Sequence, residues 1–165
     1  MATQHTPPAI GEIWPGEGGI YVSTIAARDD QPAYHLILAE TDIGRFYWGH
    51  FDDKTLAVSL YDGHSNTAAL LKAASANPTL SYPAAQAAGS YTADGHQDFY
   101  LPAIAELHDA WLSLGDKDWG WIWSSSQRSE DVAYRQLFAQ GVQYPDSFGK
   151  NGELRVYPVR RVLAE

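Results

Sequence analysis

The amino-acid sequence predicts an α+β fold with a mostly antiparallel sheet, and three observations support this class. Segments rich in β-branched and aromatic residues lie near both ends of the chain, over residues 19–39 and 119–162. Helical signals lie between them, over residues 66–114. Strands and helices do not alternate as βαβ units, so a parallel sheet is not indicated. The chain has 165 residues, which suits one domain.

The N-terminal part predicts an arm followed by a hairpin. Residues 1–18 are rich in proline and glycine, so we expect an extended arm ahead of a single domain that spans residues 19–165. Residues 19–26 and 34–39 have strand composition, and the polar residues between them predict a hairpin with a loop of several residues. The aromatic run at residues 46–51 predicts a further strand or a buried loop.

Two short helices are predicted next. The Asn66-Thr67 pair can cap a helix that runs to Ala74, and Asn77-Pro78 ends it. Pro83 suits the first turn of an alanine-rich helix over residues 84–88, because its fixed φ is helical and its missing N–H is not needed there.

The third predicted helix has the clearest pattern. It opens at Pro102 and closes at Gly115. Apolar side chains fall at spacings of three, four and three residues, at Ile104, Leu107, Trp111 and Leu114. This spacing places them on one face of the helix, which we expect to pack on the core.

Strands return in the last third of the chain. The expected strands are residues 119–123, 132–138, 141–144 and 154–162. Alternation would place Trp119, Trp121 and Trp123 on one face of the sheet. They could form an indole platform that stacks on a ligand, or they could fill the core. Three exposed indoles would form an aggregation-prone patch, so we expect at least two of the three in the core.

Composition excludes several classes of protein. Asp and Glu number 20 against 11 Lys and Arg, and a net charge of −9 repels nucleic acid and anionic membrane surfaces. The chain has no cysteine, which excludes disulfides, thiolate metal sites and a cysteine nucleophile. It has no secretory signal and no apolar run of about 18 residues, so we expect a protein made in the cytoplasm that does not bind membranes.

Three groups of histidine and carboxylate residues could suggest metal or acid–base chemistry. They are Asp62/His64, Asp94/His96/Asp98 and His50/Asp52/Asp53. Their spacings match no zinc signature, and Asp-Gly is a common turn dipeptide, so turns are favoured and neither a metal nor a cofactor is expected. Ser124, Ser125 and Ser126 are candidate nucleophiles, but no histidine lies near them in sequence.

Several motifs in order carry a resemblance to a known family. Residues 94–107 contain Asp-Gly-His-Gln-Asp-Phe-Tyr-Leu-Pro and then Glu106-Leu107. They resemble the "Gly-x-x-Asp-Trp-Arg-Leu-Pro-x-x-x-Glu-Leu" signature of the domain family named after the C-terminus of a collagen-like bacterial adhesin. Residues 122–125 stand where that family has Tyr-Trp-Ser-Ser, and residues 156–162 resemble its closing strand. Residues 18–21 are similar to the N-terminal part of its phage and prophage members.

This resemblance implies a C-type-lectin-like fold, a twisted antiparallel sheet flanked by two to three helices with both termini at the sheet. In that fold Trp123 would pack against Leu107 and Trp111, and Ser124 would begin the loop after its strand. The related formylglycine-generating enzymes use cysteine chemistry, which the missing cysteines exclude here. Calcium-dependent sugar binding is not indicated, because Glu-Pro-Asn and Trp-Asn-Asp motifs are missing.

These observations predict a non-enzymatic binding module, encoded by a phage or prophage, that recognises a surface protein or a glycan through its C-terminal loops. Polar and aromatic residues in these loops have the composition of adaptable binding surfaces. The candidate ligand-binding residues are Gln127, Arg128, Asp131, Arg135, Gln143, Tyr144, Asp146, Phe148 and Asn151.

Two alternatives remain open. The chain could be a structural or oligomeric subunit of a tail-fibre-like assembly, and so part of a phage virion or tail-like particle, with Phe46, Tyr47, Trp48 and Phe51 as the contact. The less favoured alternative is an uncharacterised hydrolase that uses His50, His64 or His96.

Overall fold

The computed structural model describes residues 6–139, 143–144 and 149–164. The elements are β1 (Ile13–Trp14), β2 (Gly19–Ile25), β3 (Tyr34–Leu38), β4 (Arg45–Phe46), α1 (Gly63–Ala76), α2 (Pro83–Ser90), α3 (Ile104–Leu114), β5 (Trp121–Gln127), β6 (Ala133–Leu137), β7 (Gln143–Tyr144), β8 (Leu154–Arg155) and β9 (Val159–Leu163). The three helices follow the first strands and precede the last ones, so the predicted α+β class is confirmed.

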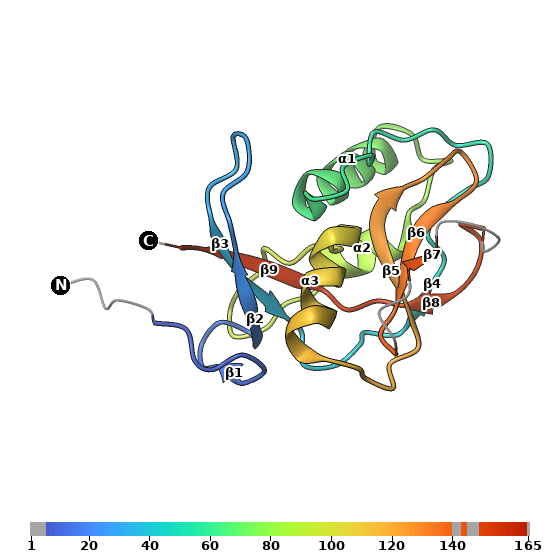
Figure 1. Cartoon of the computed structure of the whole chain (residues 1–165). Coiled ribbons are helices and arrows are strands. Elements are labelled where there is room, and N and C mark those ends of the chain that lie inside the picture. The colour runs from blue at the N-terminus through green and yellow to red at the C-terminus, as the bar shows by residue number, and fades with distance from the viewer. Residues whose placement is uncertain (1–5, 140–142, 145–148, 165) are drawn as a thin grey trace.

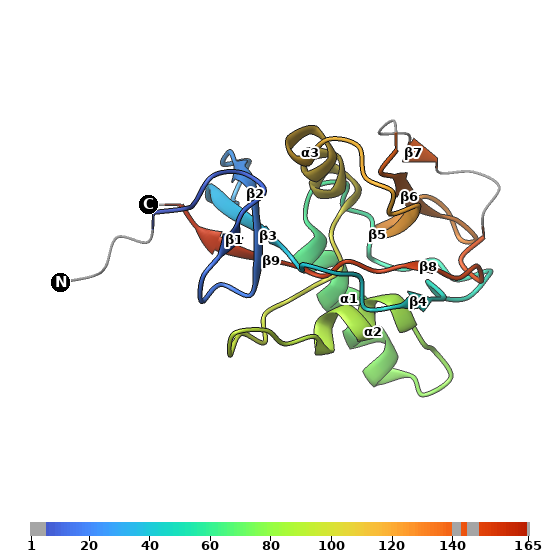
Figure 2. The same cartoon turned by 90° about the horizontal axis from the view of Figure 1, so that it is seen from below.

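The strands form two sheets and not the single sheet that we expected. One has the order β1-β2-β3-β9, and the other has the order β4-β8-β5-β6-β7. The pairs are antiparallel except β5 with β8. The predicted strand over residues 154–162 divides between the sheets at Pro158, which has no N–H to donate to a ladder. Figure 2 shows α3 on one side of the strands and α1 and α2 on the other.

The N-terminal segment is part of the fold, so the predicted boundary after residue 18 is wrong for the residues described. Strand β1 pairs with β2, and Trp14 is only 3% exposed. Glu17 forms a buried ion pair with Arg160 of β9. Burial of the large apolar surface of Trp14 favours docking over a solvated arm, and the ion pair with Arg160 compensates the burial of the Glu17 charge. The next element, the β2–β3 hairpin, is as predicted, and its loop projects from the sheet (Figure 1).

Helix α1 begins earlier than its sequence signal suggested. Asp62 is its N-cap, and the Asp62 carboxylate accepts a hydrogen bond from Ser65 N at 3.0 Å. Asn66 and Thr67, the expected caps, are buried inside the helix and bind backbone groups of neighbouring loops instead. Our placement of the cap was therefore wrong by about one turn.

Helices α2 and α3 agree with prediction. Pro83 occupies the first turn of α2, and α3 runs from Ile104 to Leu114 and ends at Gly115. None of the helices in the described part of the chain has the length and apolarity needed to cross a bilayer.

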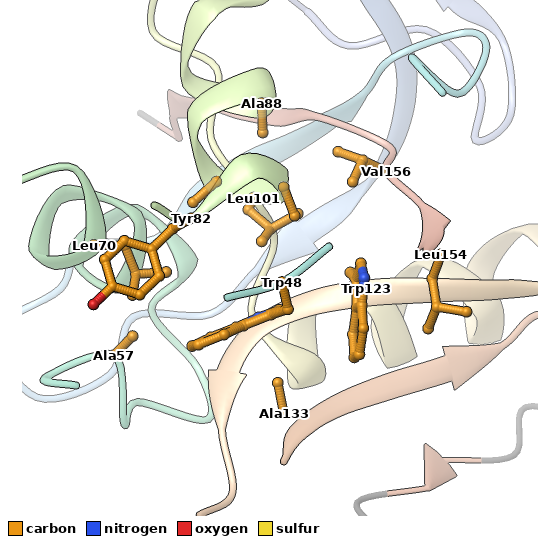
Figure 3. Close-up of a cluster of buried hydrophobic side chains, with 12 residues drawn as sticks. Trp48, Ala57, Leu70, Tyr82, Ala88, Leu101, Trp123, Ala133, Leu154 and Val156 are labelled. Atoms are coloured by element: carbon orange, nitrogen blue, oxygen red, sulfur yellow. The ribbon is translucent and has the colours of Figure 1, made fainter. Parts of the chain in front are cut away.

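The core has two main clusters, one on each side of β5. Trp48 and Trp123 lie in the cluster that contacts α1 and α2 (Figure 3). Leu107 lies in the other cluster, with Trp111 packed against it, so the expected contact of Trp123 with these two residues is wrong. The cause is the strand's alternation, which directs Ile122 toward α3 and Trp123 away from it.

The three tryptophans before and in β5 do not form a platform. Trp123 is fully buried, and half-buried Trp121 packs against the same cluster. Trp119 packs on the opposite cluster, because Gly120 has φ 68° and breaks the alternation just before the strand. The expectation that at least two of the three serve the core is confirmed.

Candidate functional site

Three segments that are far apart in sequence meet at the C-terminal end of β5. They are residues 51–58, 127–131 and 149–151, which we call the loop cluster. Asp52 N donates to the Asp131 carboxylate at 2.8 Å, and Lys150 N donates to the Asp131 carbonyl at 3.0 Å. The cluster therefore brings together four of the predicted ligand-binding residues: Gln127, Arg128, Asp131 and Asn151.

Lys150 lies at the centre of the loop cluster and is fully buried. Its Nζ donates to Asp53 O at 2.6 Å, to Glu130 O at 2.6 Å and to Gln127 Oε1 at 3.0 Å. The same Nζ lies 4.9 Å from the centroid of the Trp48 ring. Burial lowers the pKa of Lys150 to about 8, and the charge of Asp53 opposes this shift. One side chain thus joins all three loops.

Gln127 has a positioning role and is not an exposed contact residue. Its side chain is buried, and Oε1 accepts from Thr55 N at 3.0 Å as well as from Lys150. Gln127 N donates to Ala57 O at 2.7 Å. The expectation that its side chain contacts a ligand needs correction, because the side chain is buried and its Oε1 already accepts two hydrogen bonds within the protein.

The loop held by Gln127 presents two aliphatic side chains to solvent. Leu56 is 85% exposed and Val58 is 59% exposed, whereas Ala57 between them is fully buried. Thr55 Oγ1 accepts a hydrogen bond from Ala57 N at 3.1 Å, so side-chain bonds fix the backbone on both sides of Leu56. The sequence did not lead us to expect a binding role for Leu56 and Val58, although larger aliphatic residues alternate with small residues from Leu56 to Leu60.

A hollow of about 470 Å³ lies beside Val58. Its lining residues are Lys54, Val58, Gln127, Arg128, Ser129, Glu130 and Asp131. Two cations and two carboxylates therefore surround one apolar wall. Such a mixture can hold polar groups by charge-assisted hydrogen bonds and apolar groups by burial.

Arg135 is not part of the hollow. Arg135 is buried in β6, with its guanidinium 4.2 Å from the centroid of the Trp121 ring, so the expected ligand contact needs correction. Gln143 and Tyr144 form β7, which pairs with β6. Asp146 and Phe148 lie outside the described residues.

The predicted interface residues divide into exposed and buried ones. Tyr47 and Phe51 are each 48% exposed, and Phe46 is half-buried in β4. Trp48 is fully buried, and its Nε1 donates to Ser124 O at 2.7 Å, so it cannot form part of a surface. Successive side chains of residues 46–48 point in alternating directions, so Trp48 lies in the core while Tyr47 is exposed to solvent.

A second buried charge, Glu106 of α3, lies in the scaffold. Its Oε1 accepts from Tyr34 and Tyr100 hydroxyls at 2.7 Å each. Its Oε2 accepts from Ala103 N at 2.8 Å and from Gly63 N at 3.2 Å. Burial raises the pKa of Glu106, and these hydrogen bonds oppose the shift. Because both of its carboxylate oxygens accept hydrogen bonds within the protein, we assign Glu106 a structural role.

The histidine and carboxylate groups serve turns and caps. Asp94 and Gly95 have φ of 49° and 82°, so the predicted turn is confirmed there. His96 Nε2 donates to Gly16 O at 2.8 Å, and His50 Nε2 accepts from Ser81 N at 2.9 Å. Within the described part of the chain, no three metal-ligating side chains lie close enough to hold an ion.

The serines after Trp123 lie within β5, although we expected Ser124 to begin a loop. Ser126 Oγ accepts from Ile104 N at 3.0 Å and donates to Ser59 O at 2.8 Å. Ser124 Oγ donates to Tyr134 O at 2.7 Å. All three serine side chains are buried, and these bonds satisfy backbone groups as we expected.

Neither the known protein families nor the curated proteins contain a match to this chain.

Proposed function

We propose that this chain is a non-enzymatic binding module, of the kind that phages and prophages encode, and that it recognises a surface protein or a glycan through the loop cluster. One observation carries the proposal: three distant segments are fixed around buried Lys150 and together present exposed apolar and charged side chains. A surface that is rigid before binding loses less conformational entropy when a ligand binds.

The composition of this surface supports recognition of a ligand. Leu56 and Val58 offer apolar area without further loop ordering. Lys54 and Arg128 offer donors, and Glu130 and Asp131 offer acceptors, around the same hollow. Charges placed beside an apolar patch select a partner by complementarity and set its orientation.

A C-type-lectin-like fold is part of this proposal. Two short sheets with three helices, and the first and last strands in one sheet, are consistent with it. Figure 1 shows β1 and β9, the first and last described strands, at the same side of the molecule, in agreement with that fold. Binding residues are often carried on loops that a rigid scaffold positions, and the loop cluster begins where β5 ends.

A binding screen against a glycan array and a panel of purified bacterial envelope proteins tests the proposal. We expect at least one specific ligand, and we expect the double variant Leu56→Asp, Arg128→Glu to weaken its binding at least tenfold. Leu163→Asp is the matched control, because Leu163 is 64% exposed on β9, in the other sheet. If the protein binds no member of either panel, the proposal is contradicted. If the control variant weakens binding as much as the double variant does, the loop cluster is not the binding surface.

A structural subunit of a tail-fibre-like particle is the second candidate. The exposed rings of Tyr47 and Phe51 favour it, because Tyr47 lies just before the loop cluster and Phe51 is its first residue, four positions further along the chain. The Phe51 ring packs over Gly149, where an added Cβ would come within 2.6 Å of it. Light scattering at high concentration distinguishes the candidates: a stable oligomer that Tyr47→Ser, Phe51→Ser disrupts supports the subunit, and a monomer counts against it.

A further inference from the structure

A groove of about 480 Å³ lies between α3 and the β2–β3 hairpin, separate from the loop cluster. Ser23 of β2 and Arg28 of the hairpin loop line one side, and Ala105, Glu106, Asp109 and Leu112 of α3 line the other. Residues of the hairpin loop line one side of the groove, and Figure 1 shows that this loop projects from its sheet. The volume is typical of sites for small ligands.

Helix α3 presents a second face to this groove. Ala105, Asp109 and Leu112 follow one another at spacings of four and three residues, so they share a face that differs from the core face. Leu112 is 62% exposed, and the small side chain of Ala105 leaves space. This face of α3 is therefore apolar with one carboxylate, that of Asp109. The Glu106 carboxylate also lines the groove, but it already accepts four hydrogen bonds within the scaffold.

A bulge in β2 directs a polar group to the same groove. The register with β3 shifts between Tyr21 and Ser23. The hydroxyls of Tyr21 and Thr24 hydrogen-bond to each other at 2.9 Å, while Ser23 lines the groove with the α3 residues. Ser23 Oγ is buried, and no group among the described residues hydrogen-bonds to it. A buried hydroxyl without a partner is uncommon and calls for an explanation.

Besides the buried Glu106, the groove has one charged side chain on each wall, Arg28 and Asp109. Arg28 of the hairpin is held with its guanidinium carbon 3.7 Å from the centroid of the Tyr61 ring. Asp109 of α3 is half-buried, and among the described residues no donor forms a hydrogen bond or ion pair with its carboxylate. Burial raises the pKa of Asp109, and the charges of His108 and Arg28 oppose this.

We propose that this groove binds a short zwitterionic peptide, with its ammonium group at Asp109, its carboxylate at Arg28 and an apolar side chain against Leu112. Charge complementarity favours a zwitterion over a simple anion or a simple cation. A simple anion would meet Asp109 and the field of a chain with net charge −9, and a simple cation would meet Arg28. A ligand that carries both charges satisfies both walls, and Ser23 Oγ offers a further hydrogen bond.

Four forms of the dipeptide alanyl-leucine test this proposal: both termini free, N-acetylated, C-amidated and doubly capped. Titration of the ¹⁵N-labelled protein, followed by NMR, gives each affinity and shows which amides shift. We expect the free dipeptide to bind about tenfold tighter than either singly capped form, because each terminus forms a charge-assisted hydrogen bond. The largest shifts are expected at residues 23–28 and 105–113.

Two variants separate the two charged contacts. Asp109→Asn should weaken binding of the free and amidated forms about tenfold and leave binding of the acetylated form unchanged. Arg28→Gln should weaken binding of the free and acetylated forms about tenfold and leave binding of the amidated form unchanged. Asp118→Asn and Arg45→Gln are matched controls, because both residues are exposed outside the groove. The proposal is wrong if the free dipeptide gives no saturable shifts, if the doubly capped form binds as tightly, or if the control variants reduce binding as much. The NMR spectrum of each variant reports its fold directly.

Discussion

Glu106 and Lys150 are both buried charges that join several segments, yet their surroundings differ. Glu106 accepts four hydrogen bonds, two from tyrosine hydroxyls and two from backbone N–H groups at the beginnings of α1 and α3. Lys150 donates to two loop carbonyls and to the side-chain amide oxygen of Gln127 at the end of β5. The anion holds the scaffold together, and the cation holds the candidate binding surface.

This difference follows from the groups that each kind of segment leaves unpaired. Helix starts leave N–H groups free, and these need an acceptor such as a carboxylate. Loops leave carbonyls free, and these need a donor, of which an ammonium group has three. Because each buried charge joins a different set of segments, we expect that substitutions can perturb the scaffold and the loop cluster independently.

The largest effect is expected from Glu106→Ala. The substitution removes the acceptor for four donors and leaves them buried without a partner, and it also removes a carboxylate 4.0 Å from Arg161. Loss of one partner from such a buried charged network costs about 3–5 kcal/mol. Urea denaturation measures the change in the free energy of unfolding. Glu153→Ala is the control, because Glu153 is exposed, and its effect should stay within about 0.5 kcal/mol.

Lys150→Met should have a smaller and more local effect. Methionine keeps most of the length of the apolar stem, but it lacks the ammonium group, so the carbonyls of Asp53 and Glu130 lose their donor. Unsatisfied buried acceptors cost about 1–3 kcal/mol each, so we expect a loss of about 2–3 kcal/mol after the loops relax.

Hydrogen exchange shows where Lys150→Met acts. Amide protection should fall in residues 51–58 and 127–131 while α3 remains protected. Lys72→Met, an exposed residue of α1, is the control. Uniform loss of protection over the whole chain would contradict the idea that the loop cluster opens independently.

The two centres should respond to pH in opposite directions. Burial raises the pKa of Glu106, so the folded state holds this proton more tightly than the unfolded chain, and stability from this group falls as pH rises above about 4.5. Burial lowers the pKa of Lys150 to about 8, against about 10.4 in the unfolded chain, so stability from this group rises between these pH values.

Differences between variants isolate each of these effects. The deficit of Glu106→Gln relative to the natural chain should grow as pH falls from 7 to 5. The deficit of Lys150→Met should grow as pH rises from 7.5 to 9.5, below the range in which buried tyrosines titrate. Denaturation curves at these pH values measure both deficits, and deficits that stay constant or shrink would show that burial does not control these groups.

The scaffold was largely predictable because its signals are local. The spacing of Ile104, Leu107 and Leu114 and the positions of Pro83 and Gly115 depend on neighbours in sequence, and α2 and α3 formed where they predicted. The β2–β3 hairpin followed for the same reason.

The loop cluster depends on contacts across the chain, and local patterns could not reveal it. Lys150 lies in a Gly-Lys-Asn-Gly sequence typical of an exposed turn, yet its partners are 20 to 97 residues away. Gln127 and Arg135 were expected to be exposed for the same reason, since long polar side chains are usually solvated. Trp14 shows the converse, because its proline- and glycine-rich surroundings concealed a core residue.

The smallest effect is expected at Leu56, and it gives the sharpest comparison within the loop cluster. Leu56→Ser removes a side chain that is 85% exposed, so the free energy of unfolding should change by less than about 0.5 kcal/mol. Ala57→Leu at the next position inserts a larger side chain into a fully buried site and should cost about 1–3 kcal/mol. Urea denaturation of both variants measures this contrast. If Leu56→Ser proves as costly as Ala57→Leu, Leu56 contributes to folding, and its exposure is then no sign of a surface kept for a partner.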